Sequence, residues 1–174
     1  MKQKAVFLDR DGVINIEKNY LYKIDDFEFI DGVFEALQYL QSKNYLLFVI
    51  TNQSGINRGY YTKDDFFKLT NWMLDQFKKH DITISQVEFC PHTPDENCLC
   101  RKPHTQMIQN ILTNYDIDLE QSWLIGDKTS DILCGNNIGI TNTIQVQSGH
   151  KFDYSNASFV IEKLNYKNIS KIIK

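Results

Sequence analysis

The stretch from Val6 to Gly12 constrains the fold more than any other part of the sequence. Val6, Phe7 and Leu8 form an apolar run that leads into two carboxylates, Asp9 and Asp11, and Gly12 then interrupts it. An apolar run of this kind is typical of a strand covered on both faces, whereas an ionised carboxylate at its end needs a cation or several hydrogen-bond donors. The sequence therefore predicts a buried strand that carries two acids to the edge of a sheet, beside a metal ion, a ligand or both.

The rest of the chain alternates apolar strand-like runs with amphipathic helical segments. Strands are expected at 4–8, 45–50, 87–90, 122–125, 142–146 and 158–161, and helices at 33–42, after 62, at 105–115, from about 130 and at 165–173. Strands separated by helical crossovers indicate a Rossmann-like α/β fold, a parallel sheet with helices on both faces. We expect one domain over residues 1–174, because a chain of this length with 42% hydrophobic residues has the material for one full core.

Charge and hydropathy limit the partners. The formal net charge is −3, and the sequence has no basic run or tail of the kind that binds nucleic acid or an anionic membrane. No apolar stretch approaches the ~18 residues of a membrane span, and the first residues run into a strand rather than a signal peptide. We expect a cytoplasmic monomer whose partner is a small molecule.

Polar residues follow several of the predicted strands. In an open parallel sheet the ligand site lies outside the carboxyl ends of the strands, so these residues are expected to converge. They are Asp9 and Asp11, Thr51 and Asn52, and Asp127 with Lys128 and Asp131. Carboxylates, a hydroxyl and lysines at one edge suit Mg²⁺ together with a phosphate, and Asp9 and Asp127 would bind the ion directly.

This set of residues suits phosphoryl transfer. Asp9 would attack phosphorus and form an aspartyl-phosphate, and Asp11 would protonate the leaving alkoxide and later deprotonate the hydrolytic water. Thr51 would donate to a phosphoryl oxygen, and Lys102 would offset the charge on the transferring group. Each pattern alone has a plainer explanation as a turn, a cap or a loop. Their order along the chain, each after a predicted strand, favours an active site.

A second metal site is predicted in the loop at 90–100. Its three thiols and one imidazole are the complement of a closed tetrahedral zinc site, so the zinc would be structural. The alternative is a loop histidine among free thiols. Zinc would hold Arg101 and Lys102 toward the active site, and the Arg101 guanidinium suits a carboxylate or a second phosphate. The predicted ligands are Cys90, His92, Cys98 and Cys100.

These motifs resemble a known family. Asp9-Arg10-Asp11-Gly12, Thr51-Asn52, Lys102 and Gly126-Asp127-Lys128 with Asp131 resemble the four motifs of haloacid-dehalogenase-type phosphatases. Longer blocks at 9–15, 27–33, 51–59 and 100–103 are similar to those of the D-glycero-D-manno-heptose 1,7-bisphosphate 7-phosphatase group. The resemblance covers roughly residues 4–147. Many proteins with this fold carry a large cap domain, and no segment between the motifs is long enough for one, so we expect the fold without it.

The resemblance implies a role for each matching residue. Asp9 would be the nucleophile and Asp11 the acid/base, with Mg²⁺ held by Asp9, the backbone carbonyl of Asp11, and Asp127. Thr51 and Lys102 would orient the phosphoryl group, and Lys128 would brace the acids. The substrate, a small phosphorylated sugar, would contact Glu17, Lys18, Asn19, Tyr20, Asn52, Gln53, Ser54, Arg101 and Lys128.

Several alternatives stay open. Histidinol-phosphate phosphatases share the acid motifs and the Cys/His zinc loop, and another sugar phosphate or either heptose anomer is also compatible. A different class is an inactive binding module that keeps the fold and the zinc loop. Arg58 suits a surface ion pair as well as a role in closing its loop over substrate. His104 is near the site by sequence only.

Overall fold

The apolar run at the start of the chain forms a strand in the middle of a parallel sheet. The computed structural model describes residues 2–148 and 156–174. Every strand pairing in this part of the chain is parallel, which confirms the predicted α/β sheet. From edge to edge the strands are β3 (Ile84–Cys90), β2 (Leu46–Asn52), β1 (Ala5–Leu8), β4 (Trp123–Gly126), β5 (Asn142–Val146) and β6 (Phe159–Ile161).

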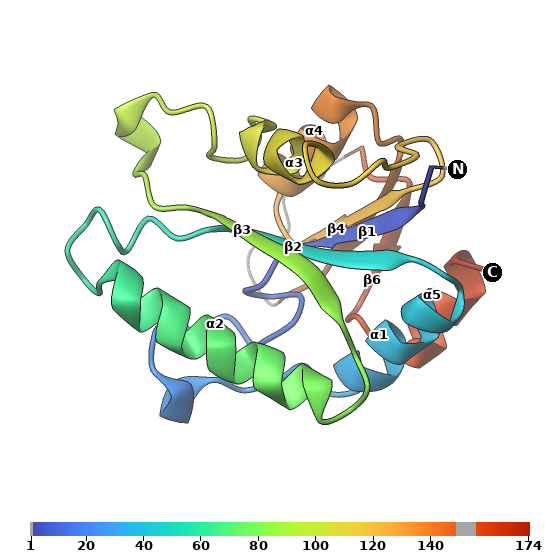
Figure 1. Ribbon diagram of the computed structural model, residues 1–174, viewed down its shortest axis with the longest axis horizontal. Coiled ribbons are helices and arrows are strands. Elements are labelled where there is room, and N and C mark those ends of the chain that lie inside the picture. The colour runs from blue at the N-terminus through green and yellow to red at the C-terminus, as the bar shows by residue number, and fades with distance from the viewer. Residues whose placement is uncertain (1, 149–155) are drawn as a thin grey trace.

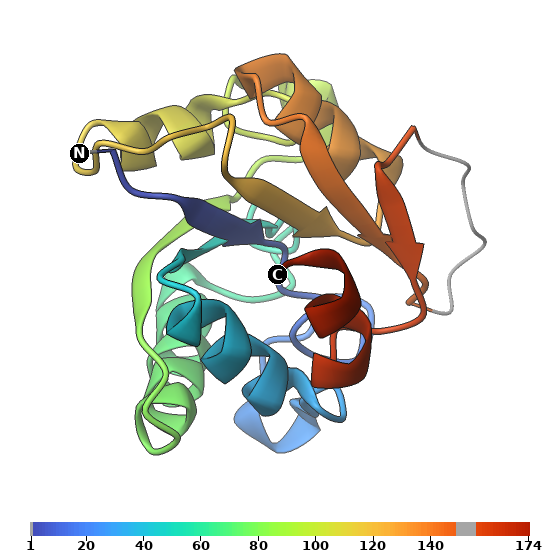
Figure 2. The same ribbon diagram turned by 90° about the vertical axis from the view of Figure 1, so that its right-hand side faces the viewer.

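Helices cover both faces of the sheet (Figures 1 and 2). One layer contains α1 (Val33–Ser42), α2 (Lys63–Lys78) and α5 (Tyr166–Ile172), and the other contains α3 (Gln106–Leu112) and α4 (Thr129–Ile138). Two short 3₁₀ turns, Ile24–Asp26 and Pro94–Glu96, lie in connecting loops. Among the described residues, no helix is both long enough and apolar enough to cross a membrane.

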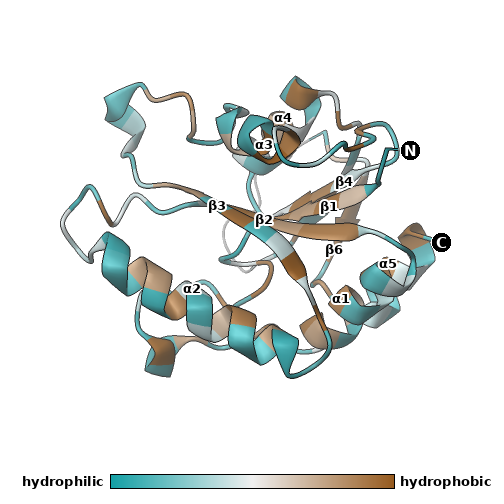
Figure 3. Cartoon of the chain, viewed as in Figure 1, coloured by the Kyte–Doolittle hydropathy of each residue, from teal (hydrophilic) through white to brown (hydrophobic). Residues whose placement is uncertain are grey.

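The alternation of side chains along β1 divides the core into two layers. Val6 and Leu8 pack in the cluster that includes residues of α1, α2 and α5, whereas Phe7 packs with residues of α3 and α4. All three side chains are fully buried, which is the burial expected of a strand covered on both faces. Hydrophobic residues accordingly gather on the central strands in Figure 3.

The helix after residue 62 begins as its sequence predicts. The Thr62 hydroxyl accepts a hydrogen bond from the backbone N–H of Asp65 at 3.1 Å, and the Asp65 carboxylate accepts one from the N–H of Thr62 at 2.8 Å. This reciprocal capping box satisfies N–H groups that the first turn of a helix cannot pair internally.

Three element boundaries differ from the expectations by two residues or more. β3 begins at Ile84 rather than 87, because a half-covered edge strand carries polar residues that hide it from a search for apolar runs. β2 continues through Thr51 and Asn52, which pair with β3. α3 spans Gln106–Leu112 rather than 105–115, because threonine and asparagine follow it and favour turns over helix.

The strand order reverses at β1. The chain passes from β1 to β2 and β3 on one side, then crosses back to β4, β5 and β6 on the other. Such a switch point leaves a crevice outside the carboxyl ends of the strands, where ligands bind in open α/β sheets. The residues that follow β1, β2 and β4 therefore surround one location.

Candidate active site

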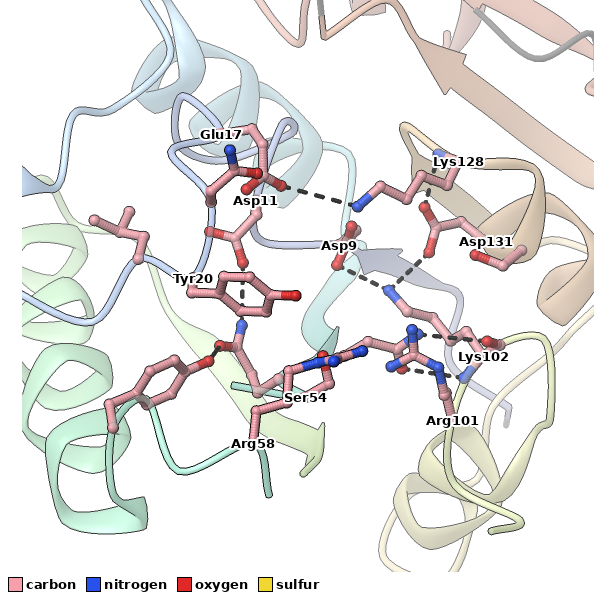
Figure 4. A pocket seen from close by; sticks show the side chains of 16 residues that line it. Asp9, Asp11, Glu17, Tyr20, Ser54, Arg58, Arg101, Lys102, Lys128 and Asp131 are labelled. Carbon is pink, nitrogen blue, oxygen red and sulfur yellow. Dashed lines mark hydrogen bonds and ion pairs between the residues drawn. The ribbon is translucent and has the colours of Figure 1, made fainter. Parts of the chain in front are cut away.

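A buried ion cluster lies at this switch point (Figure 4). The ammonium of Lys102 is 2.8 Å from Asp9 Oδ1 and 2.7 Å from Asp131 Oδ1, and it also donates to the carbonyl of Ile50 at 2.8 Å. Asp9 follows β1, Asp131 lies in the first turn of α4, and Lys102 comes from the loop after β3. A single lysine thus joins three separate parts of the chain.

The electrostatics of the cluster show an excess of negative charge. Burial raises the pKa of Asp9 well above its ordinary value; Lys102 opposes this rise, and Asp131 and Asp127 add to it. Burial also raises the pKa of Asp127 to about 6, with the charge of Asp131 acting in the same direction. Burial opposes the charge of Lys102, but Asp131 and Asp9 outweigh it, so the pKa of Lys102 is raised. A further cation would stabilise the ionised carboxylates.

The carboxylates present donor atoms that fit such a cation. Oxygen atoms of Asp9, Asp127 and Asp131 lie within 4.8 Å of one another. Asp127 Oδ2 accepts a hydrogen bond from the Ser148 hydroxyl at 2.9 Å, whereas its Oδ1 is buried with no partner among the described residues. Gly12, at φ 84°, lets the loop after β1 approach, since a Cβ there would be 2.5 Å from Asp127 Oδ2. Hard oxygen donors around an unpartnered buried oxygen fit Mg²⁺.

Asp131 has a second set of partners. Its Oδ2 accepts hydrogen bonds from the backbone N–H groups of Asp127 at 3.1 Å and Lys128 at 3.0 Å. Together with the Lys102 contact, these bonds occupy both of its oxygens. Asp131 therefore fixes Lys102 and the loop that carries Asp127.

The carboxylate of Asp11 is held by three donor side chains. Arg10 Nη2 lies 3.0 Å from Asp11 Oδ2, Asn15 Nδ2 lies 3.0 Å from Oδ1, and Gln53 Nε2 lies 3.0 Å from Oδ2. Burial alone would raise the pKa of Asp11, but the charge of Arg10 and these hydrogen bonds outweigh it and lower the pKa. On an extended chain Arg10 would point away from Asp11, but β1 ends at Leu8 and the following turn brings the guanidinium back to Asp11.

Side chains at the end of β2 hold protein groups in place. The buried Thr51 hydroxyl accepts from Gln53 Nε2 at 2.8 Å. The Asn52 amide brackets the backbone of Lys102, accepting from its N–H at 3.1 Å and donating to its carbonyl at 3.4 Å. The side chains of Asn52 and Gln53, which the resemblance assigns to substrate, are engaged in positioning Lys102 and Asp11.

Most of the predicted site residues line one open pocket with a volume of about 270 Å³. Thr51 and Asp127 are buried and do not line it. Lys18 lies outside it, where its ammonium donates to the carbonyl of Asp26 at 2.9 Å and pairs with Glu28 at 3.3 Å. The predicted residues that line the pocket are Asp9, Asp11, Glu17, Asn19, Tyr20, Asn52, Gln53, Ser54, Arg101, Lys102 and Lys128.

The rim of the pocket carries positive charge and an aromatic ring. Arg58 lines it, and its guanidinium carbon lies 5.9 Å from the centroid of the Tyr20 ring. Arg101 lies across from Glu17 in Figure 4, and Lys128 is 3.9 Å from the carboxylate of Glu17. Arg58 has no ion pair among the described residues, and His104 is not part of the pocket lining.

The loop after β3 gathers the four predicted zinc ligands. Donor atoms of Cys90, His92, Cys98 and Cys100 lie within 4.8 Å of one another, with His92 facing the thiols through Nδ1. Three thiols and an imidazole are the donor set of structural tetrahedral zinc. Arg101 Nη1 donates to the carbonyl of His92 at 3.2 Å, so the loop and the pocket wall are directly connected.

Several contributors were not identified from the sequence. Asn15 contacts Asp11, Ser148 contacts Asp127, and Tyr61 contacts Gln53 at 2.5 Å. Asn15 lies in the block 9–15, whose similarity to the family indicates a functional region but does not identify Asp11 as the partner of Asn15. Ser148 and Tyr61 lie on loops whose direction an apolar pattern does not predict.

Comparisons with known proteins agree with this geometry. Residues 7–145 match the family described as haloacid dehalogenase-like hydrolase. The chain is 52% identical over 151 residues to a D-glycero-alpha-D-manno-heptose-1,7-bisphosphate 7-phosphatase of Campylobacter jejuni, covering 87% of each chain. It is 49% identical over 142 residues to a D-glycero-beta-D-manno-heptose-1,7-bisphosphate 7-phosphatase of Helicobacter pylori, covering 81% of this chain and 82% of the other.

A solved structure has the same fold. The crystal structure of a D,D-heptose 1,7-bisphosphate phosphatase from B. bronchiseptica, complexed with magnesium and phosphate, superposes with a TM-score of 0.84 at 28% identity. The match covers 92% of this chain and 93% of that one.

Proposed function

The chain belongs to the haloacid dehalogenase-like hydrolases, and on that premise we propose that it removes the 7-phosphate of D-glycero-D-manno-heptose 1,7-bisphosphate in a Mg²⁺-dependent reaction. The observation that carries the proposal is the cluster at the switch point. There Asp9 lies 2.8 Å from Lys102, beside Asp127 and its unpartnered buried oxygen. This arrangement supplies a nucleophile, a fixed positive charge and cation ligands in one place.

In the first step, Asp9 attacks the phosphorus of the 7-phosphate. The bond between phosphorus and the C7 oxygen breaks as Asp11, which must be in its protonated form for this step, gives its proton to that oxygen, and an aspartyl-phosphate forms on Asp9. In the second step, Asp11 takes a proton from water, which attacks phosphorus, releases inorganic phosphate and regenerates Asp9. The positive charge of Lys102, held by Asp9, Asp131 and the Ile50 carbonyl, would offset the charge of the phosphoryl group, and the Thr51 hydroxyl would orient its oxygens. Mg²⁺, held by Asp9, Asp127 and the Asp11 backbone carbonyl, would shield the charge of the phosphate when bound.

Cationic side chains around the pocket are suited to the second phosphate. Arg58, Arg101 and Lys128 bring three cationic side chains to a pocket of about 270 Å³. Guanidinium groups can bind a phosphate through two parallel hydrogen bonds. Tyr20 lies between Asp11 and Arg58 in Figure 4 and offers an apolar face to the sugar. A small bisphosphorylated sugar matches this distribution of charge.

We also propose that zinc occupies the Cys90, His92, Cys98 and Cys100 site and has a structural role. The loop contributes Arg101 to the rim and leads directly into Lys102. Closing the loop around a metal would reduce the freedom of both cationic side chains. The two core layers on either side of one sheet support a single-domain organisation.

The proposal is tested by phosphate release from both anomers of heptose 1,7-bisphosphate and from histidinol phosphate, with and without Mg²⁺. The wild type is compared with Asp9→Asn and with Asp75→Asn, which makes the same change on the exposed face of α2. We expect Mg²⁺-dependent release from a heptose bisphosphate by the wild type and Asp75→Asn, and none by Asp9→Asn. Faster turnover of histidinol phosphate than of heptose 1,7-bisphosphate would overturn the substrate assignment. If no phosphomonoester were hydrolysed, the chain would instead be interpreted as an inactive binding module.

A further inference from the structure

The side-chain amide of Gln53 is fully engaged in hydrogen bonds to protein groups. Its Nε2 donates to Asp11 Oδ2 at 3.0 Å and to Thr51 Oγ1 at 2.8 Å. Its Oε1 accepts from the Tyr61 hydroxyl at 2.5 Å and from Arg10 Nη2 at 3.4 Å. A primary amide has two donor hydrogens and two acceptor lone pairs, so this buried group has no capacity left for substrate.

These partners fix the orientation of the amide. Arg10 can only donate, and the ionised Asp11 carboxylate can only accept. A flipped amide would place its NH₂ group against the Arg10 guanidinium and its oxygen against the Asp11 carboxylate. Thr51, by accepting from Gln53, keeps its own hydroxyl hydrogen available for another acceptor. Gln53 thus positions the Asp11 carboxylate and makes the Thr51 hydroxyl available as a hydrogen-bond donor.

Tyr61 holds the amide from the far side. Its side chain is buried, and its ring stacks on Tyr22 with the centroids 5.3 Å apart and the planes 12° from parallel. The loop passes beneath the ring at Gly55, where a Cβ would lie 2.2 Å from the Tyr61 ring. The lack of a side chain at residue 55 therefore allows the loop from 53 to 61 to fold back and bring the Tyr61 hydroxyl to Gln53.

We propose that Gln53 is a positioning residue for Asp11 and that Tyr61 locks it in place, so that this pair controls proton delivery to the leaving group. The inference rests on the proposed phosphatase function and deepens it. Asp11 acts when the P–O bond to the leaving oxygen breaks and that oxygen takes up a proton, while the new P–O bond to Asp9 forms. The pair does not touch the reacting atoms, so it acts through the orientation of Asp11.

The dependence of rate on the leaving group separates this role from a structural one. A p-nitrophenolate leaves readily without a proton, whereas phenolate and sugar alkoxides depend more strongly on the acid. The ratio kcat/KM reports only the steps up to release of the alcohol or phenol, and so excludes hydrolysis of the aspartyl-phosphate. A misplaced Asp11 should therefore lower kcat/KM selectively for esters with poor leaving groups.

The experiment compares kcat/KM for p-nitrophenyl phosphate, phenyl phosphate and heptose 1,7-bisphosphate in wild type, Tyr61→Phe and Gln53→Leu. We expect Tyr61→Phe to lower kcat/KM about five-fold for phenyl phosphate and heptose 1,7-bisphosphate, which corresponds to the loss of one hydrogen bond. For p-nitrophenyl phosphate the decrease in kcat/KM should be less than about two-fold. Gln53→Leu should show the same selectivity with a loss of about ten-fold or more. Equal losses on all three esters, or no loss on any, would overturn the proposal.

The matched control is Tyr22→Phe. This substitution also removes a phenolic hydroxyl, but from the ring that stacks on Tyr61. The Tyr22 hydroxyl makes no hydrogen bond to the described residues. We expect this variant to keep the wild-type leaving-group dependence and unfolding temperature. A selective loss in Tyr22→Phe equal to that in Tyr61→Phe would count against the Tyr61–Gln53 contact. Wild-type turnover of the aryl esters without turnover of heptose 1,7-bisphosphate would overturn the proposed substrate alone.

Discussion

Replacing Lys102 with methionine should strongly destabilise the protein when no Mg²⁺ is added. Methionine fills a similar volume but leaves Asp9 and Asp131 without the charge that lies 2.8 and 2.7 Å from them. The Lys102 side chain is 2% exposed, and those of Asp9 and Asp131 are 10% and 2% exposed, so water cannot replace the lysine. Removing one partner of a buried pair costs about 3–5 kcal/mol. For a chain of this size the unfolding temperature should fall by roughly 6–20 °C.

Lys163→Met is the matched control for this experiment. Lys163 also lies 2.7 Å from a carboxylate, that of Asp31, but the Asp31 side chain is 93% exposed. Exposed pairs contribute at most about 1 kcal/mol, so the expected change in the unfolding temperature is a few degrees or less. Thermal unfolding followed by circular dichroism measures both variants. Equal decreases in the unfolding temperature of the two variants would refute the argument that the ion pairs of Lys102 matter more for stability because they are buried.

Three further predictions concern the metals and the second phosphate. Since burial raises the pKa of Asp9 and brings that of Asp127 to about 6, the folded protein without Mg²⁺ holds these protons more tightly than the unfolded chain. The contribution of Asp127 to stability is therefore present at low pH and is lost as pH rises through about 6, and that of Asp9 is likewise lost as pH rises. Mg²⁺ competes with the protons, so it should raise the unfolding temperature more at about pH 7.5 than at about pH 5, and an equal rise would contradict this. The purified protein should carry about one zinc per chain by elemental analysis, reduced in Cys98→Ser and retained in Cys134→Ser, because Cys134 lies in α4 outside the loop. Arg58→Met should raise KM for heptose 1,7-bisphosphate about ten-fold with KM for p-nitrophenyl phosphate unchanged, and equal changes in the two KM values would remove Arg58 from recognition of the second phosphate.

The layers of the fold follow from patterns that the sequence displays openly. β1 and the first five residues of β2 are continuous apolar runs because helices cover both faces, and such runs are recognisable without a structure. β3 shows the limit of this signal. Its polar residues lie at an edge of the sheet, so the beginning of the strand at Ile84 has no apolar signature.

The location of the candidate site could be predicted, but the direction of its side chains could not. The rule that ligands bind beyond the carboxyl ends of parallel strands brings Asp9, Thr51 and Asp127 together. It says nothing of where a long polar side chain turns. Lys18 is directed to Asp26 and Glu28, and the Gln53 amide is directed to Asp11, because those contacts depend on the path of loops with no periodic pattern.

The most direct test of the account is detection of the phosphoryl group on Asp9. Wild-type protein is mixed with Mg²⁺ and heptose 1,7-bisphosphate, quenched in acid during turnover, digested and analysed by mass spectrometry, with Asp9→Asn treated in parallel. The account predicts a peptide that contains residue 9 and carries the mass of one phosphoryl group on Asp9 in the wild type, and no such peptide in Asp9→Asn. A phosphoryl group on another residue, or undiminished phosphate release by Asp9→Asn, would contradict it.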